Sequence, residues 1–164
     1  MQLSITPKRW LLIVHIIFAA IMLGNMVTFL ILSITAAATE NPGVAEACYQ
    51  AMNVLSGTSV VASTIGATVT GIFLSVFTKW GLFNYYWIIA KEGLTLLAIG
   101  LNLWAMHAWT LEAISLTSTT DNSLDIFVIQ SKLFIGIIIQ ILSLVIMYVI
   151  SVFKPWGKRV VRSV

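Results

Sequence analysis

The chain has 164 residues, of which 59% are hydrophobic and only 9% are charged. Soluble domains carry about 25% charged residues, so this chain has too little polar surface for a water-soluble globule. Its composition predicts an integral membrane protein. The net charge of +3 does not indicate a nucleic-acid partner, because most basic residues flank apolar stretches, where they would meet anionic lipid headgroups. The single cysteine, Cys48, excludes an intrachain disulfide and a site built from several thiolates.

Four apolar stretches follow one another along the chain, at residues 10–34, 59–77, 85–106 and 126–153. Each has close to or more than the roughly 20 residues that cross the hydrocarbon core of a bilayer. Hydrocarbon offers no partner to backbone N–H and C=O groups, so each stretch should be α-helical. The sequence therefore predicts an all-α fold: one transmembrane domain, 1–164, built as an antiparallel bundle of four helices joined by short connections.

The second helix is expected to begin outside the membrane. Asn41 followed by Pro42 matches a helix cap and a first helical position, so we predict an outer extension from residue 42 to the span 59–77. This span is rich in small residues, which let membrane helices approach one another closely. We therefore expect it at the centre of the bundle. Its small residues are Ser59, Ala62, Ser63, Gly66, Ala67 and Gly71.

The charges predict the orientation of the chain. Segments 35–58 and 107–125 contain no lysine or arginine and hold five of the six acidic residues. Six of the nine basic residues lie near the two chain ends, and Lys79 lies between the second and third stretches. Short basic segments stay on the cytoplasmic side of a membrane. Both termini and the connection around Lys79 are therefore expected in the cytoplasm.

Several polar residues fall inside the predicted spans. With a helical rise of about 1.5 Å per residue, His15, Thr70, Lys91, Glu92 and Met147 come out at similar depths in the cytoplasmic half of the bilayer. An ionisable residue inside a membrane span is costly and invites a functional interpretation. We predict that His15, Thr70, Lys91 and Glu92 form an intramembrane polar cluster.

The charged members of this cluster also have structural interpretations. Lys91 can extend its ammonium toward the cytoplasmic headgroups. Glu92 is adjacent to Lys91 but points about 100° away from it on a helix, so it needs another partner or a proton. His15 is the first choice for that partner, as a structural tie in preference to a proton relay.

His15 has two further interpretations. It forms a hydrogen bond between helices, or it binds a haem b, with Met147 at a compatible depth as the second ligand, since His/Met ligation occurs in cytochromes. A metal site is not expected, because too few ligands are present. No catalytic residue is predicted, because the sequence shows no nucleophile–base pair, phosphate-binding glycine loop or catalytic pair of carboxylates.

A second, weaker polar layer is predicted further from the cytoplasmic side. Lys132 in this layer can extend toward the outer headgroups. The members of the layer are Asn25, Ser63, Asn102, Lys132 and Gln140, with His107 at the outer rim.

Residues of the first three predicted helices share a pattern with a known family. They are His15, Ala19 and Gly24 in the first helix, and Thr70, Gly71, Trp80, Gly81, Trp87 and Lys91 around the second and third. In these positions the chain resembles a family of small bacterial four-helix integral membrane proteins of unknown function. More distantly, a first-helix histidine with a third-helix lysine is similar to the membrane-bound protoporphyrinogen oxidase family, which handles haem. The resemblance implies a bacterial plasma membrane and raises the expectation that His15 and Lys91 matter and that haem binds.

Three functional hypotheses follow. The first is a non-enzymatic multi-pass membrane protein, such as an accessory or assembly subunit, without a cofactor. The second is a haem-binding or redox membrane module that uses His15. The third is a small proton-coupled transporter that uses Glu92. The expected partners are the lipid bilayer and either further copies of the chain or a larger membrane complex.

Overall fold

The computed structural model describes residues 4–77, 81–119 and 123–157. Within these ranges the chain is helical almost throughout, and four helical runs are long and apolar enough to cross a membrane. The predicted all-α class and the number of spans are therefore confirmed. The runs are Ile5–Ala38, Pro42–Val76, Tyr86–Thr117 and Leu124–Phe153.

Two of the four runs contain a short π-helical segment. In a π-helix the backbone bonds span five residues instead of four, so the segment accommodates an extra residue and rotates the helix that follows it. The elements in chain order are α1 (Ile5–Ala38), α2 (Pro42–Leu55), η1 (Ser56–Val60), α3 (Val61–Val76), α4 (Tyr86–Gly100), η2 (Leu101–Ala105), α5 (Met106–Thr119) and α6 (Ser123–Phe153).

The second run begins where the sequence predicted it. Asn41 Oδ1 accepts a hydrogen bond from the backbone N–H of Gly43 at 3.0 Å, and Pro42 lies in the first helical turn. The third run is longer than the predicted span 85–106. It continues through η2 and α5 to Thr119, so most of the predicted outer loop 107–125 is helix.

The continuation beyond residue 106 has a local cause. No glycine or proline occurs between residues 106 and 119. The hydroxyl groups there donate to carbonyls one turn earlier, Thr110 to Met106 at 2.8 Å and Thr117 to Ala113 at 3.0 Å. Such bonds satisfy the hydroxyls within the helix, so a polar composition does not end it.

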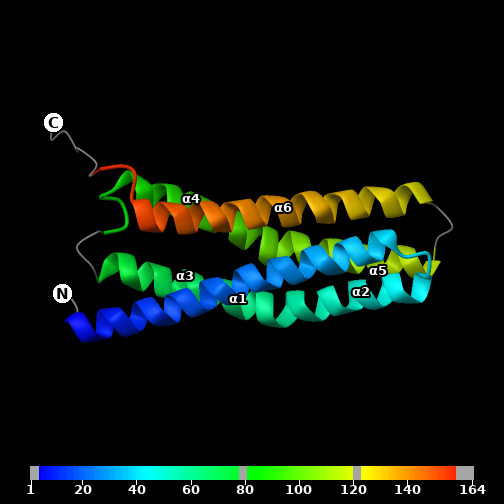
Figure 1. Cartoon of the computed structure of the whole chain (residues 1–164), viewed down its shortest axis with the longest axis horizontal. Coiled ribbons are helices and arrows are strands. Elements are labelled where there is room, and N and C mark those ends of the chain that lie inside the picture. Colours follow the sequence, from blue (N-terminus) through cyan, green and yellow to red (C-terminus); the bar gives the residue numbers. More distant parts are fainter. Residues whose placement is uncertain (1–3, 78–80, 120–122, 158–164) are drawn as a thin grey trace.

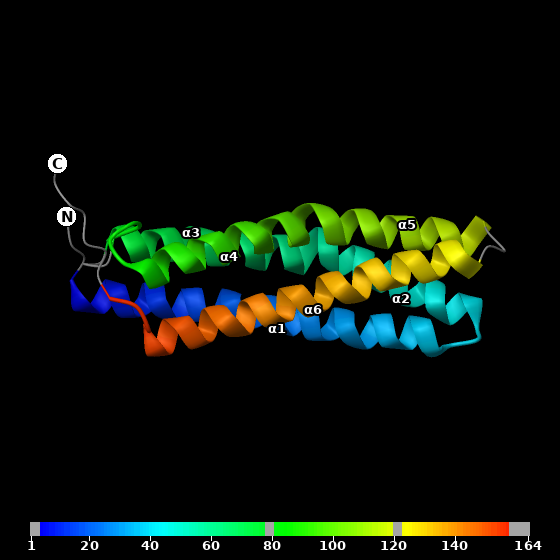
Figure 2. The ribbon, with the colours of Figure 1, turned by 90° about the horizontal axis from the view of Figure 1, so that it is seen from above.

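The four runs lie side by side along the long axis of the molecule (Figure 1 and Figure 2). The start of α1, the end of α3, the start of α4 and the end of α6 lie at one end of the molecule, which also carries both chain termini (Figure 1). α1 packs on α2, α3 and α6, whereas α3 packs mainly on α1 and touches α4 sparsely. The small residues of span 59–77 therefore mark a close approach to α1 and not the expected central position.

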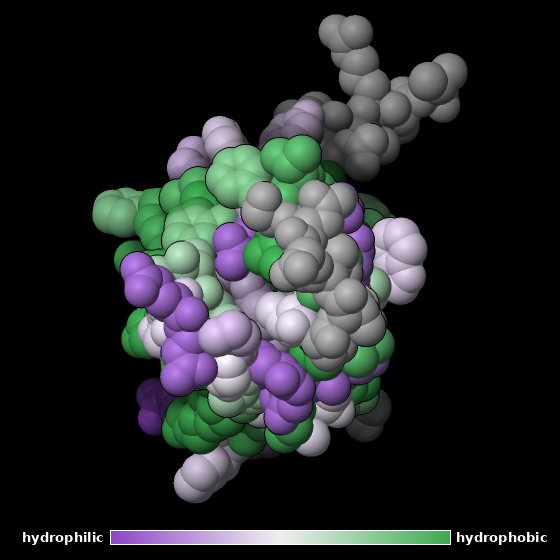
Figure 3. All heavy atoms as spheres, turned by 90° about the vertical axis from the view of Figure 1, so that its right-hand side faces the viewer, coloured by the Kyte–Doolittle hydropathy of each residue, from purple (hydrophilic) through white to green (hydrophobic). Residues whose placement is uncertain are grey.

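The apolar core is divided along this axis. A large cluster joins α1, α2, α5 and α6 and includes Phe29, Tyr49 and Ile129, whereas a smaller one near the termini joins α4 to α6 through Trp87 and Ile150. Large apolar side chains also cover the outside of the molecule, as expected where lipid replaces water. Hydrophilic residues gather on the end of the molecule opposite the termini (Figure 3).

The contact between α1 and α3 depends on glycine. A Cβ atom added to Gly66 would lie 2.5 Å from Cδ1 of the Phe18 ring, and one added to Gly71 would lie 3.3 Å from Cε1 of His15. Real Cβ atoms do not approach a ring as closely as the first distance, so α1 and α3 can pack this tightly only because residue 66 has no side chain.

We therefore expect Gly66→Ala to destabilise the protein by about 1–3 kcal/mol, the usual cost of overpacking. Thermal unfolding in mild detergent measures the effect. Gly24→Ala is the matched control, because nothing lies within 4 Å of a Cβ at that position on α1, and it should leave stability unchanged or slightly higher. Equal effects of the two substitutions would contradict the packing argument.

Candidate functional site

The predicted polar cluster lies in the half of the molecule that carries the termini. His15 of α1 and Thr70 of α3 form its first pair, with 2.9 Å between Nδ1 and Oγ1. The Thr70 hydroxyl donates its single proton to the carbonyl of Gly66 at 2.6 Å. With the hydroxyl proton assigned in this way, the Thr70 oxygen accepts from His15, and the neutral imidazole is assigned a proton on Nδ1 and a lone pair on Nε2.

Lys91 of α4 and Ser151 of α6 form the second pair. Nζ donates to Ser151 Oγ at 2.8 Å, and the serine hydroxyl donates in turn to the carbonyl of Met147 at 2.7 Å. One turn along α4, the Thr95 hydroxyl lies 3.6 Å from the sulfur of Met147. The Lys91 ammonium is thus held by Ser151, two residues before the end of α6, and the predicted extension toward the headgroups stays a prediction.

Glu92 is separated from both pairs. No hydrogen bond or ion pair joins it to His15 in the described part of the chain, and its Oε1 is buried without a hydrogen-bond partner. The predicted His15–Glu92 contact is therefore wrong. The reason is rotational: Lys91 faces α6, so the adjacent Glu92 points elsewhere, and His15 faces α3.

The two predicted haem ligands are bonded to different helices. His15 Nδ1 is bound to α3 and the Met147 sulfur to α4. Of the four predicted cluster residues, the structure therefore ties His15 to Thr70 and Lys91 to Ser151, while Glu92 bonds to neither pair.

The second predicted layer divides into two sets. Lys132 forms an ion pair with Glu112 at 3.7 Å, with both side chains almost half exposed, and His107 Nδ1 lies 3.0 Å from Ser56 Oγ. Within residues 4–77, 81–119 and 123–157, no three or more His, Cys, Asp or Glu side chains gather as a metal site would require.

The remaining predicted members, Asn25, Ser63, Asn102 and Gln140, lie near the middle of each run. Together with Thr64 they form what we call the midplane layer. All five side chains are buried. Asn25 bonds Ser63 at 3.4 Å, and Asn102 Nδ2 donates to Thr64 Oγ1 at 3.0 Å. Sequence reasoning missed Thr64, because threonine is common in membrane helices. Its position next to Ser63, at the depth of Asn102, could have indicated that it belongs to this layer.

We expect Thr70→Val to lower stability by about 1 kcal/mol, the scale of hydrogen bonds between membrane helices, because His15 Nδ1–H loses its acceptor. Thr68→Val is the matched control, since the Thr68 hydroxyl donates to the Thr64 carbonyl of its own helix at 2.7 Å. Chemical or thermal unfolding in detergent compares the two. A Thr70→Val variant no less stable than Thr68→Val would show that the interhelical bond contributes nothing.

Comparison of the chain with protein-family models, with curated protein sequences and with solved structures finds no match. The resemblance to the bacterial four-helix family and to the protoporphyrinogen oxidase family therefore remains a prediction that depends on the residues quoted above.

Proposed function

We propose that the chain is a non-enzymatic subunit of a larger membrane assembly in a bacterial plasma membrane. In this proposal it forms an antiparallel four-helix bundle with both termini in the cytoplasm, and it needs no cofactor. The observation that carries the proposal is the pairing of its intramembrane polar side chains with one another across helices, at 2.9 Å for His15–Thr70 and 2.8 Å for Lys91–Ser151.

Those pairs favour cohesion over catalysis. Each joins two helices that are separated along the chain, α1 to α3 and α4 to α6. The Lys91 ammonium and the Thr70 hydroxyl both make hydrogen bonds inside the bundle. Their chemistry is therefore directed at holding the spans together.

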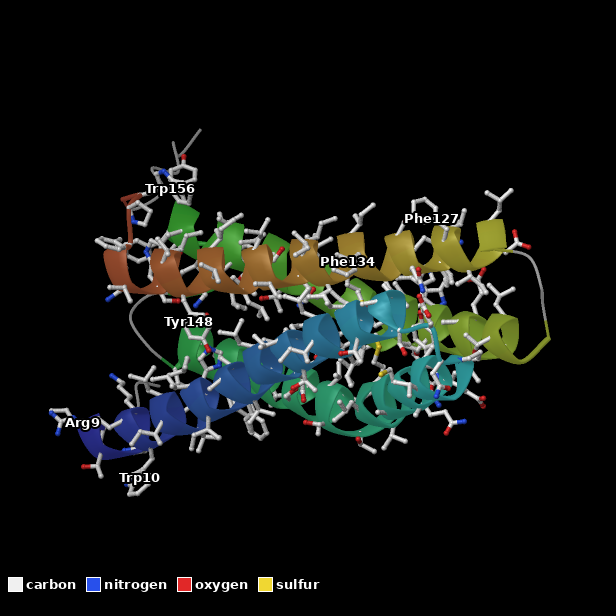
Figure 4. The ribbon with its side chains drawn as sticks, turned by 45° about the vertical axis from the view of Figure 1, so that its right-hand side comes forward. Arg9, Trp10, Phe127, Phe134, Tyr148 and Trp156 are labelled. Atoms are coloured by element: carbon white, nitrogen blue, oxygen red, sulfur yellow. The ribbon has the colours of Figure 1, made fainter. Side chains whose placement is uncertain are left out.

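The proposed orientation is supported by both charge and aromatic residues. Arg9, Trp10 and Trp156 lie at the same end of the molecule, and Phe127 lies toward the other (Figure 4). Tryptophan at a membrane boundary with basic residues beside it is typical of the cytoplasmic interface. Acidic residues are instead found toward the opposite end, where Glu112 pairs with Lys132.

Glu92 supports the proposal of a partner. An unpartnered carboxylate oxygen is costly inside a membrane, and Oε1 of Glu92 has no hydrogen-bond donor among the described residues. Two turns along the same face of α4, Ile99 borders a groove between α3 and α4 that is lined by aliphatic side chains and threonines. A partner membrane helix could lie along this groove and carry a hydrogen-bond donor at the level of Glu92. It would then cover the groove and satisfy the Glu92 oxygen.

A photo-crosslinking residue at Leu96 tests this proposal. Leu96 is 70% exposed and lies one turn from Glu92. We expect a discrete crosslinked protein in intact membranes, which Glu92→Leu abolishes and Glu92→Gln retains, because glutamine still accepts a hydrogen bond. A product of twice the chain's mass would identify a second copy as the partner. The matched control is Leu142, which is 55% exposed on α6 and should crosslink to lipid alone.

The same experiment bears on the proton-coupled transporter. In a transporter, the unpartnered oxygen of Glu92 would bind and release the transported proton. That function would need no neighbouring protein at Glu92. Crosslinking at Leu96 that goes only to lipid would contradict the subunit proposal and favour the transporter.

Haem binding remains a second candidate, because one observation favours it. A histidine that ligates iron generally donates its other ring N–H to a second protein group, and His15 Nδ1 has that arrangement with Thr70. Nε2 would then be the atom that holds the iron. The residues fit on one side only, since the Met147 sulfur contacts Thr95 on the other helix pair. A bound haem would supply one-electron chemistry.

An absorption spectrum of the purified protein decides between the two. We expect no Soret band, with or without haem added during expression. A stoichiometric Soret band that disappears in His15→Phe but survives in Thr68→Val would establish haem binding and overturn the cofactor-free proposal.

A further inference from the structure

The midplane layer carries an inference independent of the proposed function. Asn102 lies in η2, between α4 and α5, and both of these helices pack on α6, which carries Gln140. Contacts on either side fix the relative height of the two amides. On the side of the termini Thr95 contacts Met147, and on the far side a Cβ at Gly136 would meet the side chain of Met106. Asn102 lies between Thr95 and Met106, and Gln140 lies between Met147 and Gly136. The two amides are therefore at the same level.

These amides are buried and incompletely bonded. Both side chains have 0% of their surface exposed. Asn102 Oδ1 and both Gln140 atoms, Oε1 and Nε2, have no hydrogen-bond partner among the described residues. If the Asn102 amide were turned over, its oxygen would bond Thr64 in place of its nitrogen. One atom of the amide would still have no hydrogen-bond partner. Lipid cannot satisfy such groups, and leaving them unpaired would be costly.

The backbone around the amides is irregular in a second, independent way. Asn102 lies within η2, and Ser59 of η1 donates to Asn25 Oδ1 at 3.1 Å. The two π-helical segments contact each other. Short π-helical segments interrupt the regular bonding of a helix and are frequent at functional sites. Two of them on neighbouring spans thus adjoin the only layer, in the described part of the chain, where a side chain leaves both amide atoms unpartnered.

The unpartnered atoms define the class of ligand. Gln140 offers a donor and an acceptor, and Asn102 offers an acceptor. A cation would satisfy only the oxygens and would be repelled by the amide N–H groups, whereas an anion would satisfy only the donor. No charged side chain belongs to the layer. We propose that the midplane layer is a binding site for internal water, held between Gln140 and Asn102 at the centre of the membrane.

The sign of one stability change tests this proposal. A buried polar group without a partner is destabilising, so replacing it by an apolar side chain of similar shape should stabilise the protein, whereas replacing a satisfied group should destabilise it. We expect Gln140→Met to lower the unfolding midpoint by about 2–4 °C. The control is Ser143→Ala on the next turn of α6, where the buried hydroxyl donates to the Ile139 carbonyl at 2.7 Å, and it should change the midpoint less. A raised midpoint in Gln140→Met would overturn the proposal.

A second measurement uses the native sequence and does not depend on whether Gln140→Met folds. The chain has four glutamines, and the side-chain resonance of Gln140 can be assigned in 15N-glutamine-labelled protein by replacing the other three in turn. In bilayers of deuterated lipid, we expect magnetisation transfer from water to the Gln140 amide. Absence of that transfer would overturn the proposal. If Gln140→Met nevertheless lowers the midpoint, the Gln140 amide is satisfied by a protein partner and not by water.

Discussion

Hydrocarbon cannot donate or accept a hydrogen bond, and this constraint governs every polar group inside the four spans. The backbone meets it by remaining helical from end to end of each run. The side chains meet it by bonding across helices, so that His15 and Lys91, which would each be costly alone, connect α1 to α3 and α4 to α6. Among the described residues, Asn53, Glu92, Asn102 and Gln140 each keep at least one buried polar atom without a partner, and we expect something outside the chain at Glu92 and beside Gln140 and Asn102.

The division of the core has a consequence for cohesion. The large apolar cluster holds α1, α2, α5 and α6 together away from the termini, whereas near the termini the smaller cluster joins only α4 to α6. In that half, α1 and α3 are associated through Gly66, Gly71 and the His15–Thr70 bond. The large cluster also reaches Ala98 of α4 and Leu144 of α6 and packs against Met147, so the polar pairs His15–Thr70 and Lys91–Ser151 add to apolar contacts that are already present.

Sequence reasoning can predict the depth of these residues but not their direction. Depth follows from counting along a helix, so the level shared by His15, Thr70 and Lys91 could be predicted. Direction depends on which helices are neighbours, and adjacent residues differ by about 100°, so the His15–Glu92 contact was predicted wrongly. The π-helical segments also rotate the helices that follow them, and no residue in Ser56–Val60 or Leu101–Ala105 predicts this rotation. Similarly, the polar composition after residue 106 suggested a loop, although its hydroxyls are satisfied within the helix.

The length of the runs has a consequence of its own. Runs of 30 to 35 residues measure about 45–53 Å at the α-helical rise, well beyond the roughly 30 Å of hydrocarbon. If Trp10 and Trp156 mark one boundary, the helices extend beyond the hydrocarbon on the opposite side. There the Gln130 side-chain amide of α6 donates to the Tyr49 hydroxyl of α2 at 3.1 Å and joins these two helix ends. A soluble molecule approaching from that compartment would meet the described helical surfaces of α2, α5 and α6 above the lipid.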